Sequence, residues 1–283
     1  MRHRLLLLAA AALWSSAGAV IKLSRLDAWQ LAGGRALVAA AFLAVAVPAA
    51  RRRPSPRLLL VAVAYACTTV LFVLANKLTT SANAIFLQDT APLWVLLLSP
   101  WVLGERPTRG ELLSVPVFGL GLALFFLDQL SPGQLAGNLV ALVAGVAFAA
   151  SILGLRRIGS EGPAALVWGN LLAAAATLPL WPLGPAAGPG DLGAVLFLGV
   201  FQLGLAYLCF SLGLRGTPAV EASLLVLLEP VLNPVWTYLF AGERPGPWAL
   251  AGGAVILLAT AWRTLQPWIL ERRAARSTGR AEA

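Results

Sequence analysis

Ten apolar stretches, separated by short polar connectors, account for most of the chain. Each stretch is about 17–25 residues long, the helix length that crosses a hydrocarbon layer of roughly 30 Å. Because an unpaired backbone finds no water inside lipid, each stretch is expected to be helical. The predicted spans are 5–23, 28–49, 58–77, 80–103, 111–127, 133–155, 162–182, 190–214, 217–241 and 246–266. The pattern therefore predicts an all-α membrane protein with ten transmembrane helices.

The composition agrees with this class. Hydrophobic residues make up 59% of the chain and charged residues 12%, whereas a soluble domain carries roughly 25% charged residues. A net charge of +9 would suggest a nucleic-acid partner for a soluble protein. Here the basic residues lie between apolar blocks, as they do when they orient membrane helices, so no nucleic-acid partner is expected.

The sequence offers little material for a metal or cofactor site. His3, the single histidine, lies at the terminus, and Cys67 and Cys209 lie inside apolar blocks, where cysteine usually acts as a small hydrophobic residue. The glycines of 118–124 do not follow a strand, and the chain has no Walker A sequence, so a nucleotide site is unsupported. No cofactor and no metal are expected.

The connectors predict how the chain lies in the membrane. With the N-terminus placed in the cytoplasm, most of the 21 lysines and arginines fall on the cytoplasmic side, in agreement with the positive-inside rule. Both termini are therefore predicted to be cytoplasmic, with 267–283 as a basic tail. Residues 1–19 also resemble a cleavable signal peptide. An uncleaved first span is favoured because this segment has a counterpart later in the chain.

An internal repeat divides the chain into two similar parts. The sequence GERP occurs at 104–107 and again at 242–245, an offset of 138 residues. The same offset pairs Lys77 with Arg215, Thr79 with Thr217, Ala84 with Ala222, and Pro92 with Pro230. The predicted domains are 1–130 and 131–266, with five spans each. Because five is odd, the second copy enters the membrane from the opposite side. Such inverted repeats are common in secondary transporters, although a channel can also be built from them.

The repeated segments carry a family resemblance. Residues 82–92, closing on Gly-Glu-Arg at 104–106, resemble span 4 of EamA-type proteins in the drug/metabolite transporter superfamily, and residues 219–234 resemble span 9. The resemblance covers nearly the whole chain. It implies an inner-membrane carrier, not an enzyme, with a central cavity between the halves and with amino acids, metabolites or drugs as frequent exported substrates. Asp89 departs from the small polar residue that the family resemblance leads us to expect there.

Three ionisable residues fall inside predicted spans, where a charge is costly and therefore a functional candidate. Arg35 lies roughly 10 Å and Asp89 roughly 13 Å from the outer end of their spans, at 1.5 Å per residue. These depths allow a salt bridge, which could be purely structural. Alternatively, the pair could act as a gate or a ligand clamp in which Arg35 binds a substrate carboxylate.

Glu229 lies near the middle of span 9 and is followed by Pro230 and Pro234. Each proline frees a backbone carbonyl one turn earlier, and Asn233 lies on the same helix face as Glu229. The group is a candidate proton or cation site, with a buried Glu bonded to a neighbouring helix as the rival interpretation. Five further residues could line a cavity or make hydrogen bonds inside the bundle: Trp14, Gln88, Asn170, Gln202 and Tyr207.

Polar residues near the connectors suggest simpler roles. Glu221 lies near the start of span 9, where an acidic side chain complements the helix dipole. Glu105, Arg106, Glu243 and Arg244 are expected to cap helices or to form surface ion pairs.

Together, these features favour a secondary transporter that moves small organic solutes across the inner membrane by alternating access, with export as the expected direction. The expected partners are a small-molecule substrate, the lipid bilayer and protons as a coupling ion. Three alternatives remain open: a membrane-embedded enzyme or lipid-handling protein, a passive channel, and a non-transporting scaffold.

Overall fold

The computed structural model describes residues 1–127, 134–232, 246–248, 250–262 and 264–265, and every regular element in these ranges is helical. The α-helices are α1 (Arg2–Trp14), α2 (Ala17–Leu23), α3 (Ala28–Ala46), α4 (Pro56–Leu78), α5 (Ser81–Gln88), α6 (Ala91–Val102), α7 (Arg109–Phe126), α8 (Leu135–Ile158), α9 (Gly162–Thr177), α10 (Pro189–Phe197), α11 (Ala206–Leu214) and α12 (Ala219–Leu225). Short 3₁₀ helices are η1 (Pro48–Arg51), η2 (Gly159–Glu161) and η3 (Leu178–Leu183), and η4 (Leu198–Leu205) is a π-helix. A last apolar helix covers Leu250–Trp262.

Six segments of the described chain are long and apolar enough to cross a membrane. They are Arg2–Leu23, Ala28–Ala46, Pro56–Leu78, Asn83–Val102, Leu135–Leu183 and Pro189–Leu214. The segment Leu135–Leu183 is 49 residues long and contains both α8 and α9, which the short turn at η2 separates. The all-helical membrane class agrees with the sequence pattern, while the count of ten spans stays a prediction. The predicted tail, 267–283, lies outside the described residues.

Two of the predicted spans are broken near their middle rather than continuous. α5 ends at Gln88 and α6 begins at Ala91, and a turn at Val226–Leu227 interrupts the helix that begins with α12. Pro92 lies two residues beyond the first break and Pro230 three residues beyond the second. Since a proline cannot donate to the carbonyl one turn earlier, the helix opens at that point. The repeated proline therefore explains why both breaks occur.

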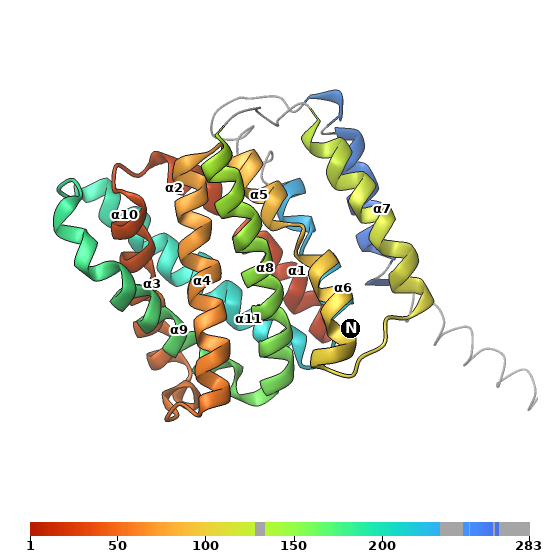
Figure 1. Ribbon diagram of the computed structural model, residues 1–283, viewed down its shortest axis with the longest axis horizontal. Helices are drawn as coiled ribbons and strands as arrows, with labels where there is room; N and C mark the ends of the chain where they lie inside the picture. The colour runs from red at the N-terminus through yellow and green to blue at the C-terminus, as the bar shows by residue number, and fades with distance from the viewer. Residues whose placement is uncertain (128–133, 233–245, 249, 263, 266–283) are drawn as a thin grey trace, which may run out of the picture.

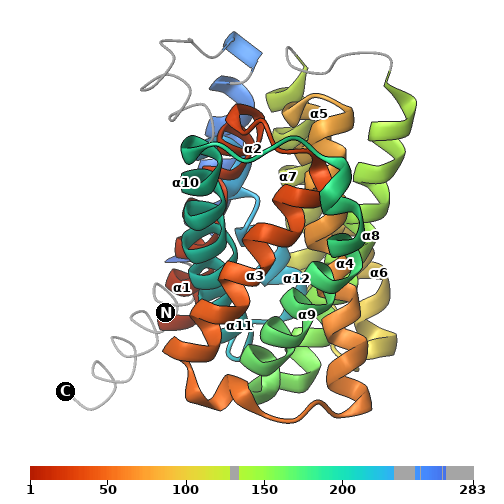
Figure 2. The same ribbon diagram turned by 90° about the vertical axis from the view of Figure 1, so that its left-hand side faces the viewer.

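The helices pack into one bundle (Figures 1 and 2). α4 lies between α8 and α9, α3 lies against α9 and η4, and α1 lies against α11. α8 also approaches the break between α5 and α6 very closely. A Cβ on Gly145 would come within 2.9 Å of the Leu87 carbonyl oxygen and 3.0 Å of the Gln88 carbonyl oxygen. Glycine at this position allows α8 to pack directly on the opened backbone.

The bundle has two ends, which we name by the chain. The N-terminal end holds the start of α1 and the connections α3–α4, α6–α7, α8–α9 and α11–α12, and the opposite end holds the connections α2–α3 and α9–α10. Polar contacts also join segments across the opposite end. The Lys22 Nζ donates to the Thr79 carbonyl at 2.9 Å, and the Asp191 carboxylate accepts from the Ser24 hydroxyl at 2.9 Å and from the Arg25 N–H at 2.7 Å.

Candidate substrate site

A small cavity lies at the centre of the bundle. Its volume is about 20 Å³, which is room for roughly one water molecule. The lining mixes aromatic, hydroxyl, amide and ionisable side chains from helices that are far apart in the sequence. The lining residues are Trp14, Arg35, Thr68, Thr69, Phe72, Gln88, Phe148, Gln202, Leu203, Tyr207 and Glu229.

Arg35 supplies the positive charge of the cavity. It lies on α3 with 1% of its surface exposed. Its guanidinium donates to the Gln202 Oε1 at 2.9 Å and to the Thr69 carbonyl at 2.7 Å. Within the described part of the chain, the Arg35 Nε has no hydrogen-bond partner. The guanidinium is thus held at two of its nitrogens, and the N–H of the third, Nε, is available for a ligand.

The salt bridge that the sequence allows between Arg35 and Asp89 does not form between these two described residues. Among the described residues, ion pairs join Arg4 to Glu221 and Arg156 to Glu105, and neither involves Arg35 or Asp89. The two depths along the membrane normal were compatible, but depth does not specify the direction in which a side chain leaves its helix. Arg35 is directed toward η4 and α4, and these elements supply its partners.

A π-helical turn places Gln202 beside Arg35. η4 packs against α3, and a Cβ on Gly199 would lie 2.8 Å from the Arg35 carbonyl oxygen. The glycine therefore allows the two backbones to approach, and the Gln202 side chain reaches the guanidinium from the next turn. π-helical turns are rare and are often found at functional sites. Sequence reasoning placed Gln202 inside a span, but nothing in the sequence pointed to the π-turn.

Two carboxyl groups supply the acidic side of the cavity. Glu229 is 6% exposed, lines the cavity and lies two residues after the break at Val226–Leu227. Asp89 is 5% exposed and occupies the break between α5 and α6. It lies near enough to Glu229 for the two carboxyl groups to interact electrostatically. Both helix breaks therefore bring a carboxyl group into the same region, and substrate and ion sites of transporters typically lie at such discontinuous helices.

Several polar atoms around the cavity are unpaired within the described ranges. Besides the Arg35 Nε, the Trp14 Nε1 is an unpaired donor, and the Gln88 Oε1 and Asp89 Oδ2 are unpaired acceptors. Buried polar atoms are normally hydrogen-bonded, so each unpaired one calls for an explanation. A ligand with an anionic and a cationic group would satisfy both kinds of atom.

Aromatic rings form one wall of the cavity. The Trp14 ring lies 4.7 Å from the Tyr207 ring and 5.7 Å from the Phe148 ring, centroid to centroid. Tyr207 also meets Tyr65 edge-on at 4.7 Å, and the Tyr65 hydroxyl donates to the Asn170 Oδ1 at 3.3 Å. These edge-to-face contacts hold the ring orientations. The wall is therefore shaped by rings from α1, α4, α8 and α11.

Five of the seven predicted site residues, Arg35, Gln88, Trp14, Tyr207 and Glu229, line this one cavity. Asp89 lies beside it, and Asn233 lies outside the described residues. Sequence reasoning missed Thr69, which contributes through its backbone carbonyl, an atom that every residue type has and that leaves no sequence signal. Their part in binding a substrate stays a prediction.

A family comparison matches the chain twice. The EamA-like transporter family model matches residues 2–127 and again residues 133–264. The chain belongs to the EamA-like transporter family. We call these two ranges the first half and the second half. The cavity is lined from both halves, with Arg35 and Gln88 from the first half and Gln202 and Glu229 from the second.

Individual relatives of this EamA-like protein agree with the assignment. The chain is 30% identical over 272 residues to the uncharacterized transporter YwfM of Bacillus subtilis, covering 90% of this chain and 91% of that protein. It is 32% identical over 220 residues to an uncharacterized transporter of Archaeoglobus fulgidus, covering 75% and 78%. It is 29% identical over 199 residues to the threonine/homoserine exporter RhtA of Escherichia coli, covering 69% and 66%.

The fold also matches a solved crystal structure with a TM-score of 0.80 at 19% sequence identity, over 93% of this chain and 97% of that one. At this identity the match concerns the fold alone. From the family and its relatives, the EamA-like protein is a multi-pass membrane transporter and not an enzyme. The membrane-embedded enzyme considered from the sequence is therefore set aside.

Proposed function

We propose that the protein is a secondary transporter of small zwitterionic solutes, foremost neutral amino acids, and that it works by alternating access. The observation that carries the proposal is the buried cavity between the two halves, whose lining holds the Arg35 guanidinium and the Glu229 carboxyl group. A cavity with room for about one water molecule is too small for an amino acid. The halves therefore have to move apart before a substrate enters.

The chemistry of the lining favours a substrate with two opposite charges. The Arg35 Nε and the Trp14 Nε1 have no hydrogen-bond partner among the described residues, and both are donors suited to a carboxylate, which guanidinium groups bind well. Glu229, with the Gln88 Oε1 nearby, offers acceptors suited to an ammonium group. Threonine and homoserine, the solutes in the name of the relative RhtA, are both molecules of this kind.

We further propose that each half contains five helices, that the halves are inverted relative to each other, and that both termini are cytoplasmic. The offset of 138 residues between the two GERP sequences and the basic connectors support this arrangement. We propose the plasma membrane as the protein's location and export as its direction, on the model of the relative RhtA, which is named an exporter. Exchange of conformations between two similar halves then opens the cavity first to one side and then to the other.

We also propose that transport is coupled to protons, which bind at Glu229 and Asp89. Glu229 and Asp89 are both buried and near enough to interact electrostatically, and two interacting carboxylates repel each other unless one holds a proton or faces a cation. Protonation and binding of the substrate ammonium group are therefore alternative ways to neutralise the same region. Such competition is what proton–substrate antiport requires.

Counterflow in proteoliposomes tests the carrier and its substrate class. Vesicles loaded with unlabelled threonine should accumulate external labelled threonine, which a channel cannot do. Alanine should compete, whereas propionate, which lacks the amine, and ethylamine, which lacks the carboxylate, should not. The absence of counterflow with every neutral amino acid would refute the proposed substrate class.

A single substitution tests the coupling site. Glu229→Gln should lose accumulation driven by an imposed pH gradient, because it cannot release a proton. Counterflow should be weakened but still measurable, because glutamine keeps an acceptor oxygen for the ammonium group and exchange needs no net proton movement. Glu161→Gln is the matched control, since Glu161 ends η2 at the N-terminal end of the bundle, away from the cavity. Gradient-driven accumulation that survives in Glu229→Gln would show that the proton is carried elsewhere.

A further inference from the structure

Two ion pairs join the first half to the second at the N-terminal end of the bundle. Arg4 binds Glu221 through two hydrogen bonds of 2.7 and 3.1 Å, and Arg156 binds Glu105 at 2.7 Å. These are the ion pairs found among the described residues. Both cross from one half to the other at the same end. Ion pairs without a role would not be expected both to join the two halves and to lie at the same end of the bundle.

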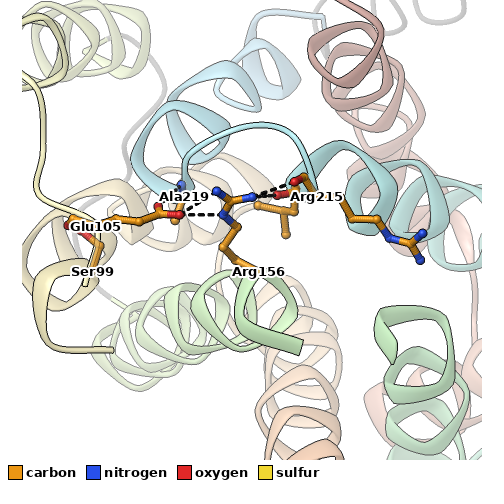
Figure 3. Close-up of polar contacts among 6 residues, drawn as sticks. Ser99, Glu105, Arg156, Arg215 and Ala219 are labelled. Carbon is orange, nitrogen blue, oxygen red and sulfur yellow. Dashed lines mark hydrogen bonds and ion pairs between the residues drawn. The ribbon is translucent and has the colours of Figure 1, made fainter. Parts of the chain in front are cut away.

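Glu105 is the centre of one of these contacts (Figure 3). It lies in the connection between α6 and α7, and its Oε1 accepts from the Arg156 Nε at 2.8 Å. Its Oε2 accepts at 3.1 Å from the N–H of Ala219, the first residue of α12. An acidic group at a helix N-terminus is favoured by the helix dipole. One carboxylate of the first half therefore holds both α8 and α12 of the second half.

Arg156 extends the contact to α11. Its NH1 donates to the carbonyls of Leu214 and Arg215 at 2.7 and 2.9 Å, where α11 ends. A cation is favoured at this position because the carbonyls of the last turn lack partners in the helix. The guanidinium thus binds the end of α11 and the carboxylate of Glu105 at once, and the start of α12 is bound to the same carboxylate.

The ion pair of Glu105 and Arg156, with the helix ends that it binds, forms a cluster that is only partly buried. The Arg156 and Glu105 side chains are 23% and 29% exposed. Charges that are this accessible can be hydrated when they separate, so the pair can break at a moderate cost, unlike a fully buried pair. α12 leads from this cluster to the break before Glu229, and α8 leads from it to Phe148 in the cavity wall. Movement at the cluster would therefore reach the cavity along two helices.

We propose that the Glu105–Arg156 ion pair is a gate, which we call the latch: it holds the two halves together and closes the N-terminal end of the cavity. The Arg4–Glu221 ion pair is a second contact of the same kind. The latch is closed in this structure, and it opens when the cavity opens to the side that the proposed orientation places in the cytoplasm. This inference rests on the alternating-access carrier proposed above. Its residues lie outside the cavity, so they control access rather than substrate recognition.

Thiol accessibility tests the latch without any substrate. Ser223→Cys, in a background where Cys67 and Cys209 are replaced by alanine, places a thiol on α12, four residues after Ala219. Ser223 is buried, and its hydroxyl donates within its own helix at 2.7 Å. The protein is reconstituted in nanodiscs, where a membrane-impermeant maleimide reaches both ends. Labelling should be slow with the latch intact.

Glu105→Ala and Arg156→Ala should each raise the labelling rate roughly tenfold or more, the shift expected from losing one hydrogen bond between charged groups. The double variant should label more slowly than the product of the two single effects predicts, because both single variants break the shared Glu105–Arg156 pair. Arg109→Ala is the control and should leave the rate unchanged, since Arg109 is an exposed cation at the start of α7 on the same end. Unchanged labelling in the single variants, or effects that multiply in the double variant, would overturn the latch.

A replacement variant and a parallel transport measurement distinguish failure of the latch from failure of folding or of the proposed substrate. If Glu105→Ala does not fold, Glu105→Gln replaces it in the same cycle, since it keeps the side-chain shape and one acceptor oxygen. Counterflow of threonine is measured in parallel on the unmodified protein. Faster labelling without any counterflow supports the latch and refutes the proposed substrate, whereas normal counterflow with unchanged labelling refutes the latch alone.

Discussion

Arg35 is a buried cation that forms no ion pair with any described residue. Replacing it should reduce transport strongly while changing the free energy of unfolding little. Arg35→Met keeps much of the side-chain length and removes the charge. It loses two charge-assisted hydrogen bonds, to Gln202 and Thr69, worth about 1.5–3 kcal/mol each. It also removes the desolvation penalty of a buried ion, which is on the order of several kcal/mol. The two effects oppose each other and are of similar size.

We therefore expect the free energy of unfolding of Arg35→Met to stay within about 2 kcal/mol of the parent, a change in Tm of less than about 8 °C. Transport should fall roughly thirtyfold or more, the usual consequence of removing one member of a buried charge pair with a ligand. Thermal melting in detergent measures the first quantity, and threonine counterflow measures the second. A charge that contributes little to folding is retained for function.

Phe210→Ala shows that the melting assay can detect a large loss. Phe210 is fully buried and packs on the Trp14 ring at 5.1 Å, so its truncation should cost about 3–5 kcal/mol. If Arg35→Met melts as low as Phe210→Ala and still transports at the parental rate, Arg35 is a structural residue and the reasoning fails.

Three further substitutions test the packing and the cavity. Gly145→Ala should lower the free energy of unfolding by about 1–3 kcal/mol, because its Cβ would meet backbone oxygens of the α5 break at 2.9 and 3.0 Å. Gly119→Ala, with nothing within 4 Å, should not lower it, and equal losses in Tm would contradict this account. Gln202→Glu should place a carboxylate 2.9 Å from the Arg35 guanidinium, raising Tm while lowering transport; a fall in Tm would count against it. Trp14→Phe should keep the ring contacts and remove the free Nε1, so KM should rise at unchanged Tm, and an unchanged KM would exclude that donor from substrate binding.

The sequence by itself determined the class of the protein and the residues of interest. A span is recognised because lipid penalises every polar residue in it, and this penalty acts residue by residue and needs no knowledge of neighbours. Arg35 and Glu229 stand out for this reason, and both line the cavity. The repeated proline similarly located the break before Glu229, since the loss of one helical hydrogen bond is a local event.

Only the tertiary structure decided which of these residues meet. Position along a span specifies depth, whereas a partner depends on the rotation of each helix and on how closely its neighbours approach. Arg35 is bound by Gln202 and Thr69 instead of Asp89 because the π-turn and Gly199 bring η4 against α3. Glu105, which the sequence suggested only as a cap or a surface partner, caps α12 and binds Arg156 in the other half. Contacts between distant segments depend on packing directions that one-dimensional patterns do not encode.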